Sequence, residues 1–430
     1  MKQQHRVFLL DYDLISPLGV GRREVFSSLA ANRMPAAKIR SFFPDALPID
    51  YAAEVEFPLL HWYGHESEAI RAAARHDRKF ELSLAVYHLM EERLRKITEL
   101  ASSERAGIIM GLGVDVPPID LLQEKIHGTL DGTDDSFADV IQLINRDKSR
   151  ISTVLNPYDL SSVFIAEKLG LGGFQKTVLT ACTASTQAIA QGYESLARGE
   201  MDVIVAGGSD SIINLLALVS FSRLGVLASS QDPSRACKPF DLNRSGTLAG
   251  EAAGLCVLVS EPFLRAHRLE PMFEILGYGN TLDAYNITAP DPQGTGMKRA
   301  FSAALMRAGV TGEQVDYINL HGTGTRSNDP VEIDAVISVF GEAARSIPMS
   351  STKDRHGHAI AAAGIQELGV LCLCMENDFV PCNVNLEKPI RESSEIDLVR
   401  CENRKAVVRT AVTTNFAFGG VNTALVLRRN

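Results

Sequence analysis

The chain has 430 residues, and its 43 basic and 52 acidic side chains give a formal net charge of −9. Hydrophobic residues make up 45% of the sequence and charged residues 22%, which excludes a mainly disordered chain. The sequence has no basic excess to neutralise phosphates, which speaks against a dedicated nucleic-acid binder. The length predicts two or three domain-sized units or one large duplicated fold.

The apolar stretches and the cysteines predict a cytoplasmic protein. The run Val7–Leu10 is too short for the core of a signal peptide. Stretches such as residues 212–221 fall below the roughly 18 residues that a helix needs to span a bilayer, so we expect no membrane span. The seven cysteines are odd in number and lack CxxC spacing, which is typical of reduced thiols.

Strand-like apolar runs alternate with helical patterns along the whole chain. The clearest runs are Val7–Leu10, Ala106–Met110, Thr177–Leu179, Val203–Ala206, Leu255–Val259, Phe273–Leu276, Tyr317–Leu320 and Val407–Thr414. Between several of them the apolar residues follow helical spacing, as in Phe80–Arg95. This alternation predicts an α/β fold whose buried strands are covered by helices on both faces.

A charged stretch at residues 260–271 separates two parts of the chain that begin alike. Arg6–Asp13 and Met272–Asn280 each predict a strand followed by a turn with a tyrosine. Each is followed by a strand that ends in a glycine-rich loop, at residues 108–114 and 318–325. This pattern is weak by itself, because α/β proteins repeat such units often, but it favours two halves at residues 1–259 and 260–430.

Cys182 is the sharpest candidate for a catalytic residue. A β-branched run leads into it, small residues flank it, and a helical pattern follows. Cys182 is therefore expected at a helix N-terminus, where free amides and the helix dipole favour the thiolate. A buried, inert cysteine is the alternative, since that is the commoner fate of cysteine.

His321 ends a buried strand and precedes a glycine loop. Asp329 fits the N-cap of the next helix, with Pro330 and Glu332 at its first and third positions. Ligand sites of α/β proteins gather at such carboxyl ends of strands. A histidine that is satisfied within the core remains the alternative.

Two further segments are candidates. Lys353 and Glu367 are charges in an alanine-rich, otherwise apolar segment, and such charges are usually solvated. His356 and His358 stand two residues apart without carboxylates or cysteines at ligand spacing, so no metal site is expected. Residues 413–422 predict a strand that breaks into a paired-glycine turn, which either only turns the chain or offers an amide to an oxyanion.

Together these segments resemble the signature blocks of the β-ketoacyl-acyl-carrier-protein synthases, elongating condensing enzymes of the thiolase-fold superfamily. The matching blocks are residues 180–186 (TACTAST), 319–335 (NLHGTGTRSNDPVEIDA), 351–367 (STKDRHGHAIAAAGIQE) and 415–422 (NFAFGGVN). Residues 206–211, 238–254 and 283–290 fit the same order. The resemblance implies a thiolase-like fold with duplicated βαβαβαββ halves in a five-layer α-β-α-β-α arrangement.

The resemblance also implies a reaction. Cys182 would take an acyl group from a carrier-protein thioester, and a malonyl thioester would then lose carbon dioxide and attack the acyl-cysteine. The product is a 3-ketoacyl chain on the carrier, and no cofactor or metal is implied. His321 and His358 would act as neutral hydrogen-bond donors to the enolate oxygen.

Further roles follow from the same resemblance. Lys353 would hold His358 and balance the local charge, supported by Glu367. The backbone amides of Cys182 and Phe418 would form the oxyanion hole, and the Phe418 ring would gate the acyl pocket. The implied partners are the acyl carrier protein and a second subunit, either identical or a diverged paralogue.

Several positions depart from the pattern of the family. Residues 10–13 (LDYD) replace a T-G-x-G-like turn, and Thr247 stands where a phenylalanine near the pocket is frequent. Ala252 and Ala361 replace glycines, and residues 415 and 417 alter the C-terminal block. These changes suggest a specialised synthase, for example for a polyene or another secondary acyl chain.

A basic cluster precedes the helical pattern at Phe80–Arg95. It consists of Arg71, Arg75, Arg78 and Lys79, in a region where members of the family often present basic residues. We expect it to dock the acidic carrier protein, with a solvated helix entry as the alternative.

Three rival functions need other residues. A degradative thiolase needs a second cysteine as a base in its C-terminal glycine-rich loop, where this chain has Phe418-Gly-Gly. A non-catalytic chain-length factor typically lacks the cysteine, and here Cys182 is present. A cysteine hydrolase could use Cys182, one histidine and Asn415, but it would have no use for the segment with Lys353 and His358.

Overall fold

The computed structural model describes residues 4–42, 44, 47–56, 58–114 and 156–430. Ten strands form two sets of five that share one topology. The first set, in chain order, is β1 (Val7–Ser16), β5 (Ala106–Leu112), β6 (Gln175–Val178), β7 (Val203–Ser211) and β8 (Glu251–Ser260). The second is β9 (Phe273–Leu282), β10 (Tyr317–Asn319), β11 (Met349–Ser350), β14 (Thr410–Phe416) and β15 (Val421–Arg429). All eight predicted strands are confirmed.

The two sets agree in strand order and in strand direction. The order is β6-β5-β7-β8-β1 in one set and β11-β10-β14-β15-β9 in the other. In both, the first strand in the chain pairs antiparallel with the last, and the inner pairs β7–β5–β6 and β14–β10–β11 are parallel. The strands β1 and β9, which begin within the two similar segments Arg6–Asp13 and Met272–Asn280, pair with each other over three residues. The duplicated fold is therefore confirmed, while the boundary at residues 259/260 stays a prediction.

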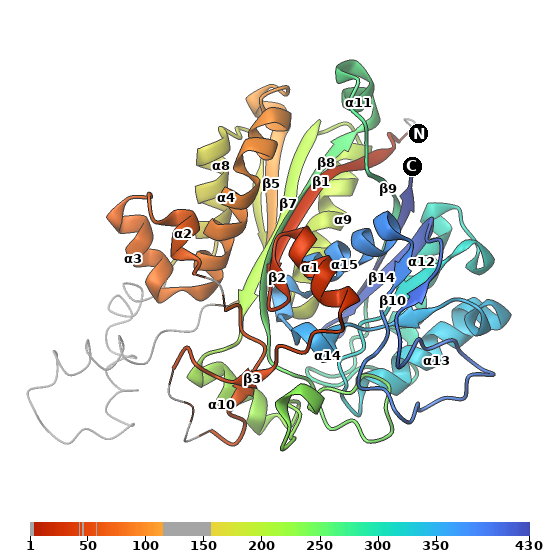
Figure 1. The fold of residues 1–430 in the computed structure, drawn as a ribbon. Coiled ribbons are helices and arrows are strands. Elements are labelled where there is room, and N and C mark those ends of the chain that lie inside the picture. Colours follow the sequence, from red (N-terminus) through yellow and green to blue (C-terminus); the bar gives the residue numbers. More distant parts are fainter. Residues whose placement is uncertain (1–3, 43, 45–46, 57, 115–155) are drawn as a thin grey trace, which may run out of the picture.

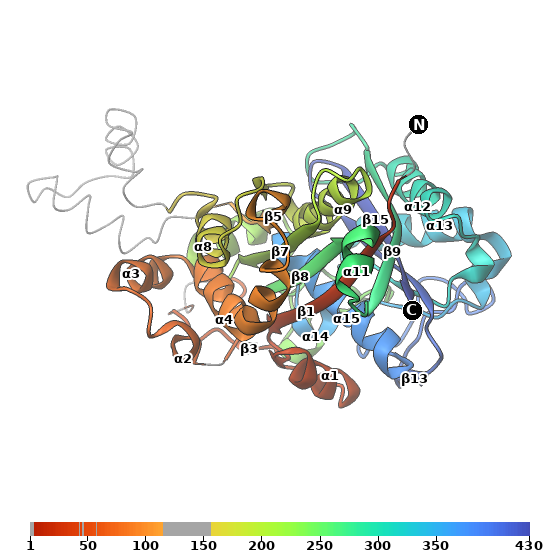
Figure 2. The same cartoon turned by 90° about the horizontal axis from the view of Figure 1, so that it is seen from above.

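Helices lie on both faces of each set (Figures 1 and 2). The helices α9 (Ala184–Ala197) and α15 (Ala363–Asn377) pack against each other and lie between the two sets of strands. On the outer face of the first set lie α4 (Arg78–Thr98) and α8 (Leu160–Leu169), and α12 (Thr295–Ala308) covers the second set, with α13 (Asn328–Phe340) packed on α12. These are the five layers that the resemblance implies.

Short elements complete the described part of the chain. The helices are α1 (Arg22–Ala30), α2 (Leu60–Tyr63), α3 (Glu68–His76), α10 (Leu215–Arg223), α11 (Glu261–His267) and α14 (Lys353–His356). The strands are β2 (Gly19–Val20), β3 (Ala37–Lys38), β4 (Tyr51–Ala52), β12 (Phe379–Val380) and β13 (Arg404–Lys405).

The central helix α15 is apolar because protein surrounds it. The stretch Ile360–Asn377 is long and apolar enough to cross a membrane by length and composition, but 83% of it is buried inside the protein. Every residue from Ala363 to Met375 is buried. Small residues permit this close packing: a Cβ at Gly364 would clash with Thr186 of α9. The helix therefore belongs to the core.

Helix α13 begins earlier than the sequence predicts. Its N-cap is Ser327, so Asp329 is not the cap. The Asp329 carboxylate instead accepts hydrogen bonds from the amides of Phe240 (2.8 Å) and Gly324 (3.2 Å). The acidic side chains at this helix start therefore fasten the neighbouring loop, because its buried amides also need acceptors.

Candidate active site

The candidate site lies where the two halves meet. Cys182 follows β6, His321 follows β10, Lys353 follows β11, and Phe418 follows β14. Each of these four strands pairs in parallel with a neighbour in its set. The segments that follow their carboxyl ends meet at one pocket. The strand order thus brings together residues that are far apart in the sequence.

Cys182 occupies the predicted turn between strand and helix. The 3₁₀ turn η2 (Ala181–Thr183) separates it from β6 and leads directly into α9. Ala181 has a φ of 46°, in the left-handed region that is costly for a residue with a Cβ. Cys182 is only 4% exposed, so this turn holds the thiol against the floor of a pocket.

Burial controls the protonation of the thiol. It raises the pKa of Cys182 to about 12, against the opposing effects of the Lys353 charge and of hydrogen bonds from the amides of Phe418 and Cys182 itself. The amides at this turn favour the thiolate, as expected, but burial has the larger effect on the pKa. The nearest acceptor for the thiol proton is Nε2 of His358, at 3.1 Å from Sγ.

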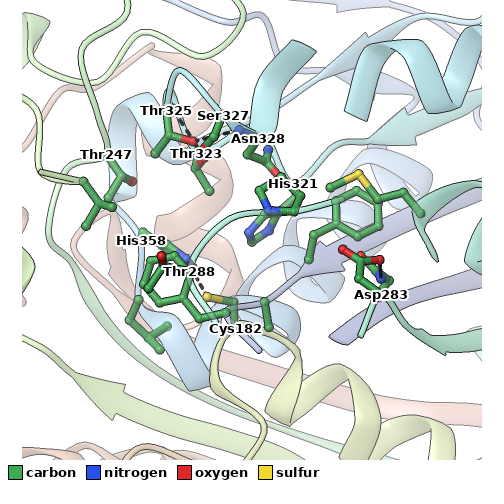
Figure 3. A pocket seen from close by; sticks show the side chains of 18 of the residues that line it. Cys182, Thr247, Asp283, Thr288, His321, Thr323, Thr325, Ser327, Asn328 and His358 are labelled. Atoms are coloured by element: carbon green, nitrogen blue, oxygen red, sulfur yellow. Dashed lines mark hydrogen bonds between the residues drawn. The ribbon is translucent and has the colours of Figure 1, made fainter. Parts of the chain in front are cut away.

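The two histidines face each other above the sulfur (Figure 3). Their ring centroids are 5.2 Å apart and their planes are nearly perpendicular, at 82°. Burial, and then the charge of Lys353, hold the pKa of His321 and of His358 well below the usual value. Both imidazoles are therefore neutral at physiological pH, as the resemblance implies. The ligand atoms of Cys182, His321 and His358 lie within 4.8 Å of one another, so a thiophilic metal ion could also bind there and block the thiol.

Lys353 contacts His321, which corrects the expectation that it holds His358. Its Nζ donates to the backbone oxygen of His321 at 2.5 Å and lies 3.2 Å from Nδ1 of the same residue. It also pairs with the carboxylate of Glu367, and both side chains are buried. Burial raises the pKa of Glu367, while the Lys353 charge lowers it. The pair thus faces the Nδ1 side of His321, so the Nε2 side of this ring is directed away from the ammonium.

Two supporting residues were missed as such by the sequence reasoning. Glu332 accepts hydrogen bonds from the amides of His321 (2.6 Å) and Gly322 (2.8 Å). Asn415 donates to Glu367 at 2.6 Å and lies 3.4 Å from Nδ1 of His321. In the sequence, Glu332 stood out only as a helix-start residue. Asn415 stood out as a departure from the family and as a candidate in the cysteine-hydrolase alternative. Neither signal indicates the partners that the structure shows.

A pocket that is partly open to solvent lies above Cys182. Its walls combine aromatic and aliphatic side chains with several hydroxyl groups, among them Thr247, Thr288, Thr323 and Thr325 (Figure 3). Thr247 is only 4% exposed, and its hydroxyl has no hydrogen-bond partner among the described residues. The departure at this position therefore places an unsatisfied polar group in the pocket wall.

Phe418 lies at the pocket on the glycine turn. The effect of its amide on the Cys182 sulfur lowers the pKa of the thiol. Its half-buried ring stacks on Phe221 at a centroid distance of 6.3 Å. Gly419 and Gly420 follow with φ values of 82° and 76°, which favour glycine. Phe418 thus lines the same pocket as Cys182, and its roles in an oxyanion hole and as a gate stay predictions.

The structure divides the predicted docking cluster. The Lys79 side chain is only 7% exposed and pairs with Asp77, and Arg78 pairs with the buried Glu251. The buried position of Lys79 speaks against a docking role for this residue, whereas Arg78 is 34% exposed and its role stays a prediction. Arg71 and Arg75 lie on α3 with side chains 34% and 55% exposed, and both pair with the carboxylate of Glu68.

Comparison with known proteins supports the fold and shows the family. Residues 67–262 match the beta-ketoacyl synthase N-terminal domain, and residues 272–387 match the C-terminal domain. The 3-oxoacyl-(acyl-carrier-protein) synthase 2 of Rhizobium meliloti (strain 1021) is 32% identical over 440 residues, covering 99% of both chains. The protein of the same name from Coxiella burnetii is 29% identical over 437 residues, again covering 99% of both.

A solved structure described as the ishigamide ketosynthase/chain length factor has a TM-score of 0.82 and 28% identity, and the match covers 99% of this chain and 100% of that one. The predicted resemblance is thereby confirmed over nearly the whole sequence. The chain belongs to the beta-ketoacyl synthase family.

Proposed function

We propose that the protein is a β-ketoacyl-acyl-carrier-protein synthase in which Cys182 carries the growing acyl chain. It catalyses a decarboxylative Claisen condensation between this acyl group and a malonyl thioester. The observation that carries the proposal is the thiol of Cys182 at 3.1 Å from a neutral imidazole, with a second neutral imidazole beside it, at the floor of one pocket.

In the first half-reaction, Cys182 attacks the carbonyl carbon of an acyl-carrier thioester. The thiol must lose its proton as the carbon–sulfur bond forms, because burial keeps it protonated at rest. His358 lies in position to pass this proton to the departing carrier thiol. The amides of Cys182 and Phe418, which both lower the pKa of the thiol, would stabilise the oxyanion of the tetrahedral intermediate.

In the second half-reaction, malonyl thioester loses carbon dioxide and leaves an enolate. A neutral imidazole can donate a hydrogen bond to the enolate oxygen without holding a carboxylate too tightly in the ground state. Nε2 of His321 and Nε2 of His358 would provide these two bonds. Once Cys182 is acylated, no thiol proton faces His358, and this ring donates in the tautomer that carries its proton on Nε2. The enolate carbon then attacks the acyl-cysteine carbonyl, the 3-ketoacyl thioester leaves on the carrier, and the Cys182 sulfur regains a proton.

The pair of Lys353 and Glu367 would keep His321 in the required form. The ammonium beside Nδ1 disfavours a second proton on this ring. With Nδ1 facing Lys353, the remaining proton belongs on Nε2, which is the nitrogen that must donate. Lys353 is therefore a positioning residue in this scheme.

The pocket wall favours a specialised acyl substrate. A buried hydroxyl without a partner is costly, and an oxygen or nitrogen on the bound chain would satisfy Thr247. The pathway, whether for fatty acids, polyketides or polyenes, is part of this proposal. So are a cytoplasmic location and a second subunit, identical or a diverged paralogue. The similarity to a structure described as a ketosynthase with a chain length factor supports a paralogous partner.

The site geometry also bears on the rivals. A cysteine hydrolase would need Asn415 to orient the histidine that serves the nucleophile. Asn415 instead lies beside His321, whereas the nearest histidine to the Cys182 sulfur is His358. This arrangement favours condensation over hydrolysis.

The test is a two-step assay with purified protein and acyl-carrier substrates of several chain types. We expect mass spectrometry to find an acyl adduct on the peptide of Cys182, and then a carrier-bound product longer by two carbons with release of carbon dioxide when malonyl-carrier is added. Release of free acid without chain extension would contradict the proposal. Efficient extension of ordinary long saturated chains would contradict only the specialised substrate.

A further inference from the structure

A cluster of possible metal ligands lies away from the pocket, against the outer helices. His65 and Glu66 are in the loop between α2 and α3, and His88 is on α4. One ligand atom from each lies within 4.8 Å of the other two. None of the three lines the cavity above Cys182, so the condensation reaction does not account for them.

His88 is buried and incompletely bonded. Its side chain is only 6% exposed. Its Nδ1 lies 3.2 Å from a Glu91 oxygen, in hydrogen-bond geometry. Its Nε2 lies 3.1 Å from Oε1 of Glu66, but this contact is not aligned as a hydrogen bond, and Nε2 has no partner among the described residues. A buried polar nitrogen without a partner requires an explanation.

The tautomer of His88 indicates what is missing. A neutral imidazole donates from one ring nitrogen only. With donation from Nδ1 to Glu91, the lone pair of Nε2 and the Glu66 oxygen are two acceptors in close approach. A cation between them would satisfy both, and the carboxylate behind the ring is the support that metal-binding histidines commonly have.

We propose that His65, Glu66 and His88 bind a Zn²⁺ ion. Two histidines and a glutamate, with water in the fourth position, are a tetrahedral zinc set. Bonds of about 2.0–2.1 Å place tetrahedral ligand atoms about 3.3 Å apart. Oε1 of Glu66 lies 3.1 Å from Nε2 of His88 and 3.9 Å from Nε2 of His65. The His65 side chain is 65% exposed, so it can rotate to close the remaining gap.

Lys168 of α8 competes for the same carboxylate. Its Nζ lies 2.8 Å from both oxygens of Glu66. Zinc would share Glu66 with this ammonium, because one oxygen can bind the ion while the other keeps the lysine. Removal of the ammonium should therefore tighten metal binding, which is the opposite of the effect of general damage to the fold.

The site would fasten the loop before α3 to the long helix α4. Helix α3 carries Arg71 and Arg75, two arginines of the proposed carrier-docking cluster. The role of the ion is therefore structural, and its removal should loosen this helix without changing the chemistry at Cys182.

The test is a Zn²⁺ titration against a chromophoric chelator, with the full-length, metal-free protein carrying Cys182→Ser, so that the active-site thiol cannot bind the ion. We expect one equivalent to bind. His65→Ala should weaken it at least about tenfold, and Lys168→Met should strengthen it several-fold. His61→Ala is the matched control, because His61 is an exposed histidine on the neighbouring helix α2. Bound Co²⁺ should show visible tetrahedral bands without a thiolate charge-transfer band.

Three results would overturn the proposal. The first is equal affinity of the His65→Ala and His61→Ala proteins. The second is a failure of the Cys182→Ser protein to bind Zn²⁺, which would mean that His88 and Glu66 lie side by side without a metal ion. The third is a Lys168→Met protein that binds Zn²⁺ no more tightly, because the ion would then not lie on Glu66.

Discussion

The two halves of the molecule share a scaffold and divide the chemistry between them. In the first half a 3₁₀ turn, η2, leads into the central helix α9, and in the second half η6 (Ile360–Ala362) leads in the same way into α15. The first residues of the two turns, Ala181 and Ile360, both have left-handed φ values, 46° and 36°. The second residues are Cys182 and Ala361. The same strained turn therefore presents a nucleophile in one half and a methyl group in the other.

The strands that border the turns show a similar division. Asp210, next to last in β7, accepts a hydrogen bond from the amide of Ala361, in the other half. Asn415, next to last in β14, bonds to Thr186 of α9, also in the other half. Each half thus ties down the central helix of its counterpart, and burial leaves these groups no water to replace the bonds. The lesson is that the scaffold is symmetric while the reactive groups are not.

The largest expected effect comes from removing the imidazoles of the second half. His321→Ala and His358→Ala should each lower the rate of decarboxylation and condensation about 10²–10³-fold, because each removes one donor to the enolate oxygen. His321→Ala should still form the acyl adduct on Cys182, since His321 takes no part in the first half-reaction. Single-turnover assays with radiolabelled malonyl-carrier measure both steps. If the rate of decarboxylation and condensation fell by less than tenfold in both variants, the two histidines of the second half would not be the donors to the enolate oxygen.

Breaking the buried ion pair tests how far the second half depends on it. Lys353→Met should lower the free energy of unfolding by about 3–5 kcal/mol, because it leaves the Glu367 carboxylate buried without its cation. Lys353→Met combined with Glu367→Leu should recover most of this loss in urea unfolding, although activity should stay low. A double variant as unstable as the single one would contradict the account of the pair.

The pH dependence of alkylation sharpens the description of the first half. Burial raises the pKa of Cys182 to about 12, so the reactive thiolate is scarce at neutral pH and its fraction rises with pH. The rate of alkylation of Cys182 by iodoacetamide should therefore increase about tenfold per pH unit between about pH 7 and 10, followed by peptide mass spectrometry. The exposed Cys401 is an internal control with an ordinary surface environment. A plateau near pH 7 would instead indicate a stabilised thiolate.

The smallest effect concerns the surface of the first half. Arg71→Glu with Arg75→Glu should raise the KM for carrier substrates several-fold and flatten its dependence on salt, with kcat little changed. Arg265→Glu is a suitable control, because Arg265 is an exposed arginine on α11, paired with Glu261. Kinetics at low and high ionic strength measure the difference. Equal KM values for the two proteins at low salt would remove α3 from the docking surface.

The sequence predicts the frame of the fold better than the contacts within the site. Apolar runs located the strands, and small residues after a β-branched run located the turn at Cys182, because these are local patterns. The approach of His358 to the sulfur depends on two turns that meet across the halves, which no local pattern reports. The expectation that His358 acts beside Cys182 came from the resemblance to a family instead.

Side-chain direction was the part that sequence reasoning misjudged. The sequence predicts that Lys79 and Arg78 belong to a basic surface cluster. In the structure Lys79 is buried and pairs with Asp77, and Arg78 pairs with the buried Glu251. Lys353 was assigned to the wrong histidine, because its reach from the end of β11 depends on the packing of β10 beside it. Such contacts are set by strand order, which brings together residues that are separated along the chain.

The most direct measurement is the single-turnover rate of chain extension by the Cys182→Ala protein. Extension depends on the thioester at Cys182, so we predict no extended carrier product above background and no acyl adduct on the protein. The protein should keep the unfolding midpoint of the wild type within a few degrees, since alanine occupies the corresponding place in the other half. Extension at the wild-type rate by this folded variant would contradict the account.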